Sequence, residues 1–139
     1  MSETISFDTG LKTFDINGKC EVVFNPTDPA FVERLYNTFD ALDKKQEAYK
    51  AEIEKAEKRE IFGIAQKRDK EMREMIDSAL GAPVCEAVFG ATNVYALSDG
   101  LPVWANLILA IMDKIDTSFA AEKRRTNPRL EKYTRKYHK

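Results

Sequence analysis

From Asp40 to Asp77 the chain reads DALDKKQEAYKAEIEKAEKREIFGIAQKRDKEMREMID. This stretch has no proline and a single glycine, Gly63. It is rich in Lys, Glu, Arg and Ala, which all favour helix. Apolar or small residues recur there at spacings of three and four, as on one side of a coiled-coil-like helix. The seam begins just before this stretch and consists of Leu35, Phe39, Leu42, Gln46, Tyr49, Ile53, Ala56 and Glu60. It is thin because Gln46 and Glu60 occupy positions that a tight coiled coil would fill with Leu or Ile. Such a helix needs cover from another helix, a second copy or a partner.

The helical pattern, from residue 28 to residue 80, is too long for a straight rod within one small domain. An unbroken helix of this length would extend roughly 78 Å at about 1.5 Å per residue. The radius of gyration expected for 139 residues is only about 14 Å. We therefore expect 28–80 to protrude as one long charged helix or to fold back as a helical hairpin. The expected hinge is 61–63, because Gly63 weakens the helix there.

Residues 5–25 show the alternating pattern of a β-hairpin. Asn17 and Gly18 separate two β-rich runs, and Asn-Gly favours a two-residue turn because both positions need positive φ. The residues that share one face of each run are Phe14 and Ile16 on the first, and Cys20, Val22 and Phe24 on the second. An isolated hairpin is only marginally stable, so we expect this one to pack on helices. Ile5–Thr9 is expected to add a third strand.

The core helices are expected within residues 83–122. A short helix is predicted from Pro83 to Phe89, and the most apolar helix of the chain follows Leu101-Pro102. The predicted core consists of Phe31, Leu35, Phe39, Val88, Trp104, Leu107, Ile108, Ile111 and Ile115. The predicted fold class is therefore α+β, with an N-terminal β-hairpin packed on a mostly helical domain. Residues 1–122 are expected to form a single domain.

The net charge of −1 hides an asymmetry. The C-terminal tail, 123–139, has eight Lys or Arg residues and one acid, whereas the remaining residues have 14 basic and 22 acidic side chains. The basic residues of interest are Lys123, Arg124, Arg125, Arg129, Lys132, Arg135 and Lys136. Such a tail is typically a solvated end. It also suits binding to an acidic protein surface, such as the acidic body of another copy, and suits nucleic acid less well.

The sequence shows no catalytic apparatus. Its only histidine is His138, in the tail, and its two cysteines, Cys20 and Cys85, match neither a zinc motif nor a redox motif. We predict that the protein is not an enzyme and that it has no metal site and no cofactor. The polar, acidic start Met1–Asp8 does not resemble a secretory signal. The apolar run Leu101–Met112 is too short to span a bilayer, so we expect a cytoplasmic protein without membrane association.

Several segments together carry a family resemblance: FDINGK at Phe14–Lys19, VVF at Val22–Phe24, the charged middle, FGATNVY at Phe89–Tyr95 and LPVWANL at Leu101–Leu107. In this layout the chain resembles small proteins from the tail-morphogenesis regions of tailed phages and prophages of Gram-positive bacteria. It is similar to their tail assembly chaperones. The resemblance implies a non-enzymatic protein that keeps the long helical tape measure protein soluble while tail-tube subunits assemble around it.

A binding role suggests which residues contact the partner. We predict contacts to a helical partner, such as the tape measure or a tail-tube protein, through Tyr49, Ile53, Phe62, Met72 and Met75. The same seam would support a homo-oligomer formed through the helical arm. Two alternatives from other classes stay open at this point. One is a structural subunit of the virion, and the other is an accessory protein that binds nucleic acid through its basic tail.

Overall fold

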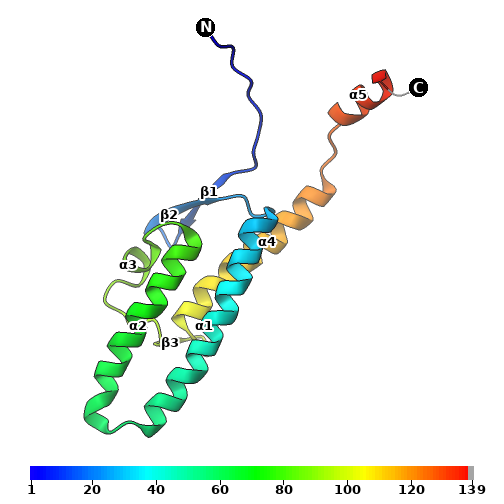
Figure 1. Ribbon diagram of the computed structural model, residues 1–139. Coiled ribbons are helices and arrows are strands. Elements are labelled where there is room, and N and C mark those ends of the chain that lie inside the picture. Colours follow the sequence, from blue (N-terminus) through cyan, green and yellow to red (C-terminus); the bar gives the residue numbers. More distant parts are fainter. Residues whose placement is uncertain (138–139) are drawn as a thin grey trace.

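The computed structural model describes residues 1–137 (Figure 1). His138, interpreted above as a tail residue, and Lys139 lie outside the described residues. The elements in chain order are β1 (Lys12–Ile16), β2 (Cys20–Phe24), α1 (Pro29–Lys55), α2 (Lys58–Leu80), α3 (Val84–Phe89), β3 (Leu97–Ser98), β4 (Leu101–Pro102), α4 (Val103–Arg124) and α5 (Arg129–Tyr137). An N-terminal antiparallel hairpin followed by a mostly helical region confirms the α+β fold class.

Strands β1 and β2 form the predicted hairpin with one extra residue in the turn. Ile16 pairs with Cys20, and the N–H of Lys19 donates to the carbonyl oxygen of Ile16 at 2.9 Å. Asn17 and Gly18 both have positive φ, at 54° and 68°, as Asn-Gly predicts. The predicted turn with Asn17 and Gly18 at its centre is confirmed. The register adds Lys19 as an extra unpaired residue, because Ile16 pairs with Cys20 and not with Lys19. The predicted faces are confirmed, because in this register the inward residues of the two strands lie opposite each other.

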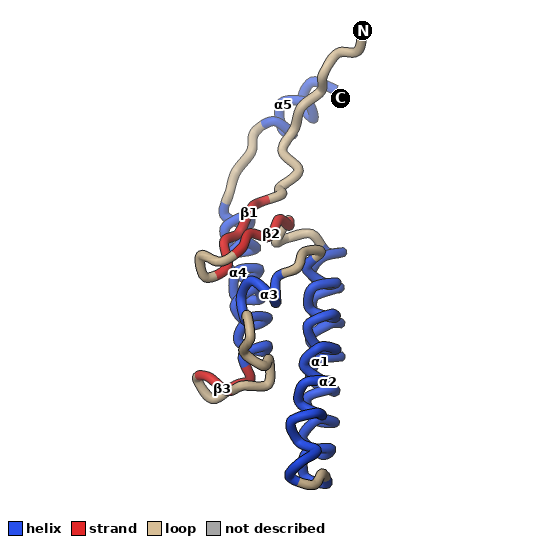
Figure 2. The backbone as a smooth tube through the Cα atoms, turned by 90° about the vertical axis from the view of Figure 1, so that its left-hand side faces the viewer, coloured by secondary structure: helices blue, strands red, loops and turns tan. Residues whose placement is uncertain are grey.

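The expected third strand at Ile5–Thr9 is absent from the described residues, because the sheet contains only β1 and β2. Residues 1–11 instead form an extended arm. Figures 1 and 2 show this arm and α5 leaving the body at the same end of the molecule. The turn between α1 and α2 lies at the opposite end. Residues 5–9 alternate as a strand does, but no strand among the described residues pairs with them.

Helices α1 and α2 fold back on each other as a helical hairpin (Figure 2). The break falls at Ala56 and Glu57, which are both extended, with ψ of 151°. The predicted hinge at 61–63 is wrong, since these residues lie inside α2. Glycine inside a helix costs only about 1 kcal/mol, which packing elsewhere can offset. With the break at this position, α1 and α2 bury Leu42, Met72 and Ile76 completely, and Arg68 of α2 meets Glu52 of α1.

The core lies between the helical hairpin, α3, β2 and α4. Phe31, Leu35, Trp104, Leu107, Ile108, Ile111 and Ile115 are buried as predicted. Phe39 and Val88 are only partly buried and pack against this core. Sequence reasoning omitted several fully buried residues: Leu42, Met72, Ile76, Val84 and Val94. The side of the helical hairpin that carries Leu35, Leu42, Met72 and Ile76 is called its inner face below.

Local signals place the remaining helices. Gly81 ends α2 in the left-handed conformation with φ of 69°, the common end of a helix. The short helix α3 follows, close to the predicted Pro83–Phe89. Pro102 immediately precedes α4, which continues to Arg124. Within residues 1–137, none of the helices combines the length and the apolar character needed to cross a bilayer.

Candidate partner-binding groove

The outer face of the helical hairpin carries an open groove of about 860 Å³. Its lining comes from both helices: Ala30, Glu33, Arg34, Asn37, Thr38, Ala41 and Lys45 of α1, and Glu71, Glu74, Met75, Ser78 and Ala79 of α2. This set is called the outer groove. Small residues along its floor let another backbone approach closely, and the half-buried Met75 adds a flexible apolar contact.

Charged side chains border the outer groove. Arg34 crosses between the helices, with its Nε donating to the carbonyl oxygen of Ala79 at 3.0 Å. Its guanidinium carbon lies 5.6 Å from the centre of the Phe31 ring. On the other side, Lys45 Nζ lies 3.9 Å from Glu71 Oε2. A surface with a small-residue floor and charges of both signs at its edges can select an amphipathic helix and fix its direction.

A second hollow of about 560 Å³ lies nearer the turn and shares Lys45 with the outer groove. Its lining includes Ala48, Tyr49, Glu52 and Arg68. The Arg68 guanidinium donates to both carboxylate oxygens of Glu52, at 2.8 and 3.0 Å. It also donates to Glu71 Oε1 at 2.6 Å. These hydrogen bonds from Arg68 lower the pKa of both carboxyl groups below the ordinary value, and they tie the helices together at this point.

The predicted partner-binding residues do not form one surface. Met75 lines the outer groove and Tyr49 lines the second hollow. Phe62 is 77% exposed near the turn, and Ile53 is half-buried. Met72 is fully buried in the core, so its interpretation as a partner contact is wrong for this fold. All five residues are apolar or aromatic, but this character and the helical periodicity do not show which side of the helix the rest of the chain covers.

Sequence reasoning missed the small residues of the outer groove, although a signal exists. Ala30, Asn37 and Ala41 of the outer groove recur on α1 at spacings of seven and four. Ala30 and Ala41 each lie one position N-terminal to a buried residue, Phe31 and Leu42. Such a stripe would have indicated a site of close helix approach, had it been read together with the seam.

The seam itself is covered within the chain. Its polar position Gln46 accepts a hydrogen bond from Nε1 of the buried Trp104 at 2.8 Å. Tyr49 stacks on Tyr95, with ring centres 3.8 Å apart. The Tyr95 hydroxyl is buried and has no hydrogen-bond partner among the described residues. Burial raises the pKa of Tyr95 to about 12. Gln46, which the sequence suggested was a weak point of the seam, therefore satisfies the indole of the core.

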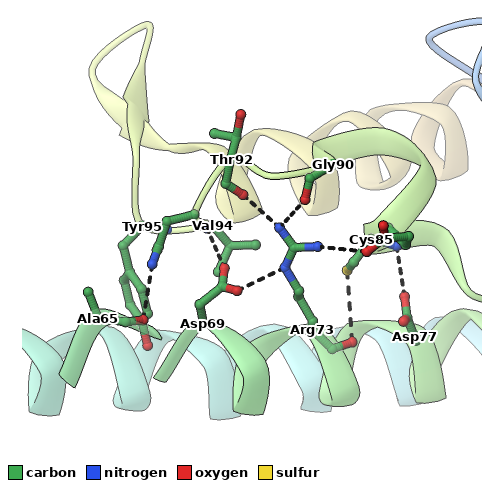
Figure 3. Close-up of polar contacts among 11 residues, drawn as sticks. Ala65, Asp69, Arg73, Asp77, Cys85, Gly90, Thr92, Val94 and Tyr95 are labelled. Carbon is green, nitrogen blue, oxygen red and sulfur yellow. Dashed lines mark hydrogen bonds and ion pairs between the residues drawn. The ribbon is translucent and has the colours of Figure 1, made fainter. Parts of the chain in front are cut away.

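Charged residues on α2 hold the loop that follows α3 (Figure 3). The Arg73 guanidinium donates to the carbonyl oxygens of Gly90 and Thr92, at 2.8 and 2.7 Å. Its Nε lies 3.0 Å from Asp69 Oδ2 as an ion pair, although this N–H is not aligned for a hydrogen bond. The other Asp69 oxygen accepts from the N–H of Val94 at 2.8 Å. The hydrogen bonds hold backbone groups of the loop, and the ion pair joins the two side chains that form them, so the cluster supports the fold.

The same holds for Asp77 and Cys85. Asp77 Oδ1 accepts from the N–H of Cys85 at 2.9 Å, at the start of α3. Burial and the nearby Asp77 raise the pKa of the Cys85 thiol well above its ordinary value. A buried thiol held in its protonated form is a poor nucleophile. Among residues 1–137, no group of three or more His, Cys, Asp or Glu residues is arranged to hold a metal ion.

The basic tail is distributed over two helices. Lys123 and Arg124 end α4, whereas Arg129 and Lys132 lie on α5 with exposed side chains. Arg125 lies between the helices, 3.8 Å from Glu122 Oε1. Arg135 and Lys136 belong to the last turns of α5. Leu130 is 78% exposed and Tyr133 is 49% exposed, so α5 carries uncovered apolar side chains among its basic residues.

Comparison of the chain with protein-family models, with curated proteins and with solved structures found no match. The groove, its charged edges and the exposed ends of the chain are therefore the basis for the functional proposal.

Proposed function

We propose that this chain is a non-enzymatic binding protein of phage or prophage tail assembly, whose outer groove holds a helix of its partner. The observation that carries the proposal is the outer groove itself, open along two antiparallel helices with a floor of small residues. The occupant that fits this shape is an amphipathic helix. The resemblance to tail assembly chaperones suggests the tape measure protein as that partner and the host cytoplasm as the place of action.

The physical chemistry favours a reversible contact. The groove is shallow, and its apolar content is limited to small side chains and Met75. Affinity should therefore be modest, since binding energy concentrates in well-packed, desolvated pockets. Charged edges such as Lys45 and Glu71 would guide orientation more than strength. A chaperone that must release its client at tail assembly benefits from this balance.

The test is binding of the chain to the tape measure protein of the phage or prophage that encodes it, with a matched pair of variants. Ser78→Arg places a large charge on the floor of the outer groove, whereas Ala120→Arg places the same charge on an exposed position of α4. We expect co-expressed tape measure protein to remain soluble and to co-purify with the wild type and with Ala120→Arg. Ser78→Arg should reduce this capture about tenfold or more, as expected for one clash at a contact. Equal capture by the two variants would refute the groove as the site.

A second candidate, a structural subunit of the virion, is supported by a separate observation. The arm of residues 1–11 is extended and exposes Ile5, Phe7 and Leu11. Extended arms of this kind suit subunits that stay joined to their neighbours. Mass spectrometry of purified particles separates the candidates, because an assembly chaperone is absent from the finished particle and a subunit is present in stoichiometric amount.

A further inference from the structure

The N-terminal arm has the pattern of a strand but lacks a sheet. Ile5, Phe7 and Leu11 are 89%, 75% and 60% exposed. Ile5, Phe7 and Thr9 occupy alternate positions, so they share one side of the extended segment, while Thr4, Ser6 and Asp8 share the other. Leu11 follows Gly10, whose positive φ interrupts this alternation. Apolar side chains repeated on one side of a strand normally face a core. Within the described chain, nothing covers them.

The base of the arm is fixed so that the arm points away from the body. Asn25 Nδ2 donates to the carbonyl oxygen of Thr9 at 3.0 Å. The Gly10 N–H donates to Asp8 Oδ1 at 2.8 Å, and Gly10 has a φ of 78°. A Cβ at Gly10 would lie 2.3 Å from Asn25 Nδ2, so only glycine fits. These contacts attach Thr9 to the residue after β2 rather than turning it back along β1.

The hairpin, in turn, has an open edge with space beneath it. Among the described residues β1 pairs only with β2, so one edge of β1 has free backbone groups. A cavity of about 160 Å³ lies between this hairpin and α4. Both the inward Phe14 and Ile16 and the neighbouring Asp15 and Asn17 line it. Val22 and Phe24 of β2 line it as well, so the cavity lies beneath both strands, next to the open edge of β1.

We propose that the segment Ile5–Thr9 of a second copy adds as a third strand to the open edge of β1. Ile5 and Phe7 of that copy then lie on the same side as Phe14 and Ile16 and cover the cavity above α4. Main-chain hydrogen bonds supply affinity and the alternate side chains supply register, as in other cases of strand addition. The sequence thus has the alternation of a third strand, but the strand that pairs with β1 comes from another molecule.

One observation favours a second copy over the arm of the same chain. The bond between Asn25 and Thr9 would have to break before the arm could fold back on its own β1. Charge does not distinguish the two arms, because Glu3 and Asp8 are present in both and the cavity is lined by Asp15 as well as Lys114. Reciprocal exchange of arms closes a dimer, and one-way exchange builds an open chain of copies.

The first experiment measures self-association by sedimentation velocity and light scattering over a range of protein concentrations. Ile5→Asp/Phe7→Asp places two charges on the apolar side of the arm, and Thr4→Asp/Ser6→Asp places the same two charges on the other side. We expect the wild type and the Thr4/Ser6 variant to self-associate and the Ile5/Phe7 variant to be monomeric. Circular dichroism should show the same fold for all three, because the side chains of residues 5 and 7 are exposed in the monomer. Equal association of the two variants, or a monomeric wild type, would overturn the proposal.

The second experiment separates exchange between copies from folding back within one chain. Phe7→Cys and Phe14→Cys are made as separate proteins, each in a Cys20→Ser background, mixed and oxidised. A disulfide that joins one protein of each kind is expected only if the arm of one copy reaches β1 of another. If the mixture gives no such product while the double variant Phe7→Cys/Phe14→Cys closes an internal disulfide as a monomer, the arm pairs within its own chain.

Discussion

The inner and outer faces of the helical hairpin consist of the same two helices, yet they differ in almost every physical respect. The inner face buries Leu42, Met72 and Ile76 completely against the rest of the core. The outer face exposes a groove with a floor of alanine and serine and a border of charges. Both faces lie on a charge-rich sequence with a thin apolar seam. The difference teaches that the seam is thin because it needs to cover only one side of each helix.

The largest loss of folding stability is expected when a large apolar side chain of the inner face is replaced by a small one. Leu42→Ala removes a fully buried side chain of the inner face and should lower the free energy of unfolding by about 2–5 kcal/mol. Ser78→Ala, at an exposed position of the outer groove, should change it by less than about 0.5 kcal/mol. Urea denaturation followed by circular dichroism measures both. Similar losses for the two variants would mean that the faces do not differ as described.

The next effect concerns the polar position of the inner face. Gln46→Leu removes the acceptor of the Trp104 indole N–H and leaves a buried donor unpaired, which costs about 1–3 kcal/mol. Gln46→Glu keeps an acceptor at neutral pH and should cost less. The comparison of their unfolding free energies at neutral pH is informative because a purely hydrophobic seam would be strengthened by leucine. A gain of stability in Gln46→Leu would show that the hydrogen bond is dispensable.

A gain in folding stability, instead of a loss, is expected at Tyr95, which stacks on Tyr49 of the seam. The buried Tyr95 hydroxyl has no partner among the described residues, so Tyr95→Phe should stabilise the fold by about 1 kcal/mol at neutral pH. Because the pKa of Tyr95 is raised to about 12 in the folded state, the wild type should lose stability between about pH 10, the ordinary tyrosine pKa, and pH 12. The melting temperature should fall less steeply with pH across this range for Tyr95→Phe than for the wild type. Parallel curves would contradict the burial of a neutral hydroxyl.

The smallest effect is expected at the ion pairs between the helices. Hydrogen bonds from Arg68 lower the pKa of Glu52 and Glu71 in the folded state. The stabilisation of the fold by the ionised Glu52 and Glu71 is therefore present above the unfolded carboxyl pKa of about 4.3. It is lost as pH falls through the lower pKa values that these groups have in the folded state. Arg68→Met should flatten the acid side of the curve of urea midpoint against pH. Arg59→Met, at an exposed ion pair with Glu57, is the control and should leave the curve unchanged.

Much of the fold could be predicted because local rules agreed with the global structure. The positive φ values at Asn17 and Gly18, the proline before α4 and the glycine that ends α2 all mark element boundaries through backbone sterics. The buried residues of α4 follow from 3.6-residue periodicity. These signals depend on a few neighbouring residues, so they can be read without knowing what lies across the core.

Predictions that depended on distant neighbours failed. Gly63 marked the weakest point of the helix by propensity, but the chain turns at Ala56 and Glu57. Met72 was interpreted as a surface contact, but it lies in the core. The outer groove was missed because α1 and α2 both line it, and the spacing on one helix does not show which side of the other helix lies beside it. In each instance the deciding partner is on another element, far along the chain.

The sequence by itself determined the elements: an N-terminal hairpin, long charge-rich helices, an apolar helix near the end and an arm with strand alternation. Periodicity, turn chemistry and helix ends are local properties of the chain, and they persist whatever the elements pack against. Only the tertiary structure decided where the long helix folds back, which side of it is buried and that the arm finds no strand partner beside it. These choices follow from burial and hydrogen bonding summed over residues that meet only after folding, such as Gln46 with Trp104 and Arg68 with Glu52.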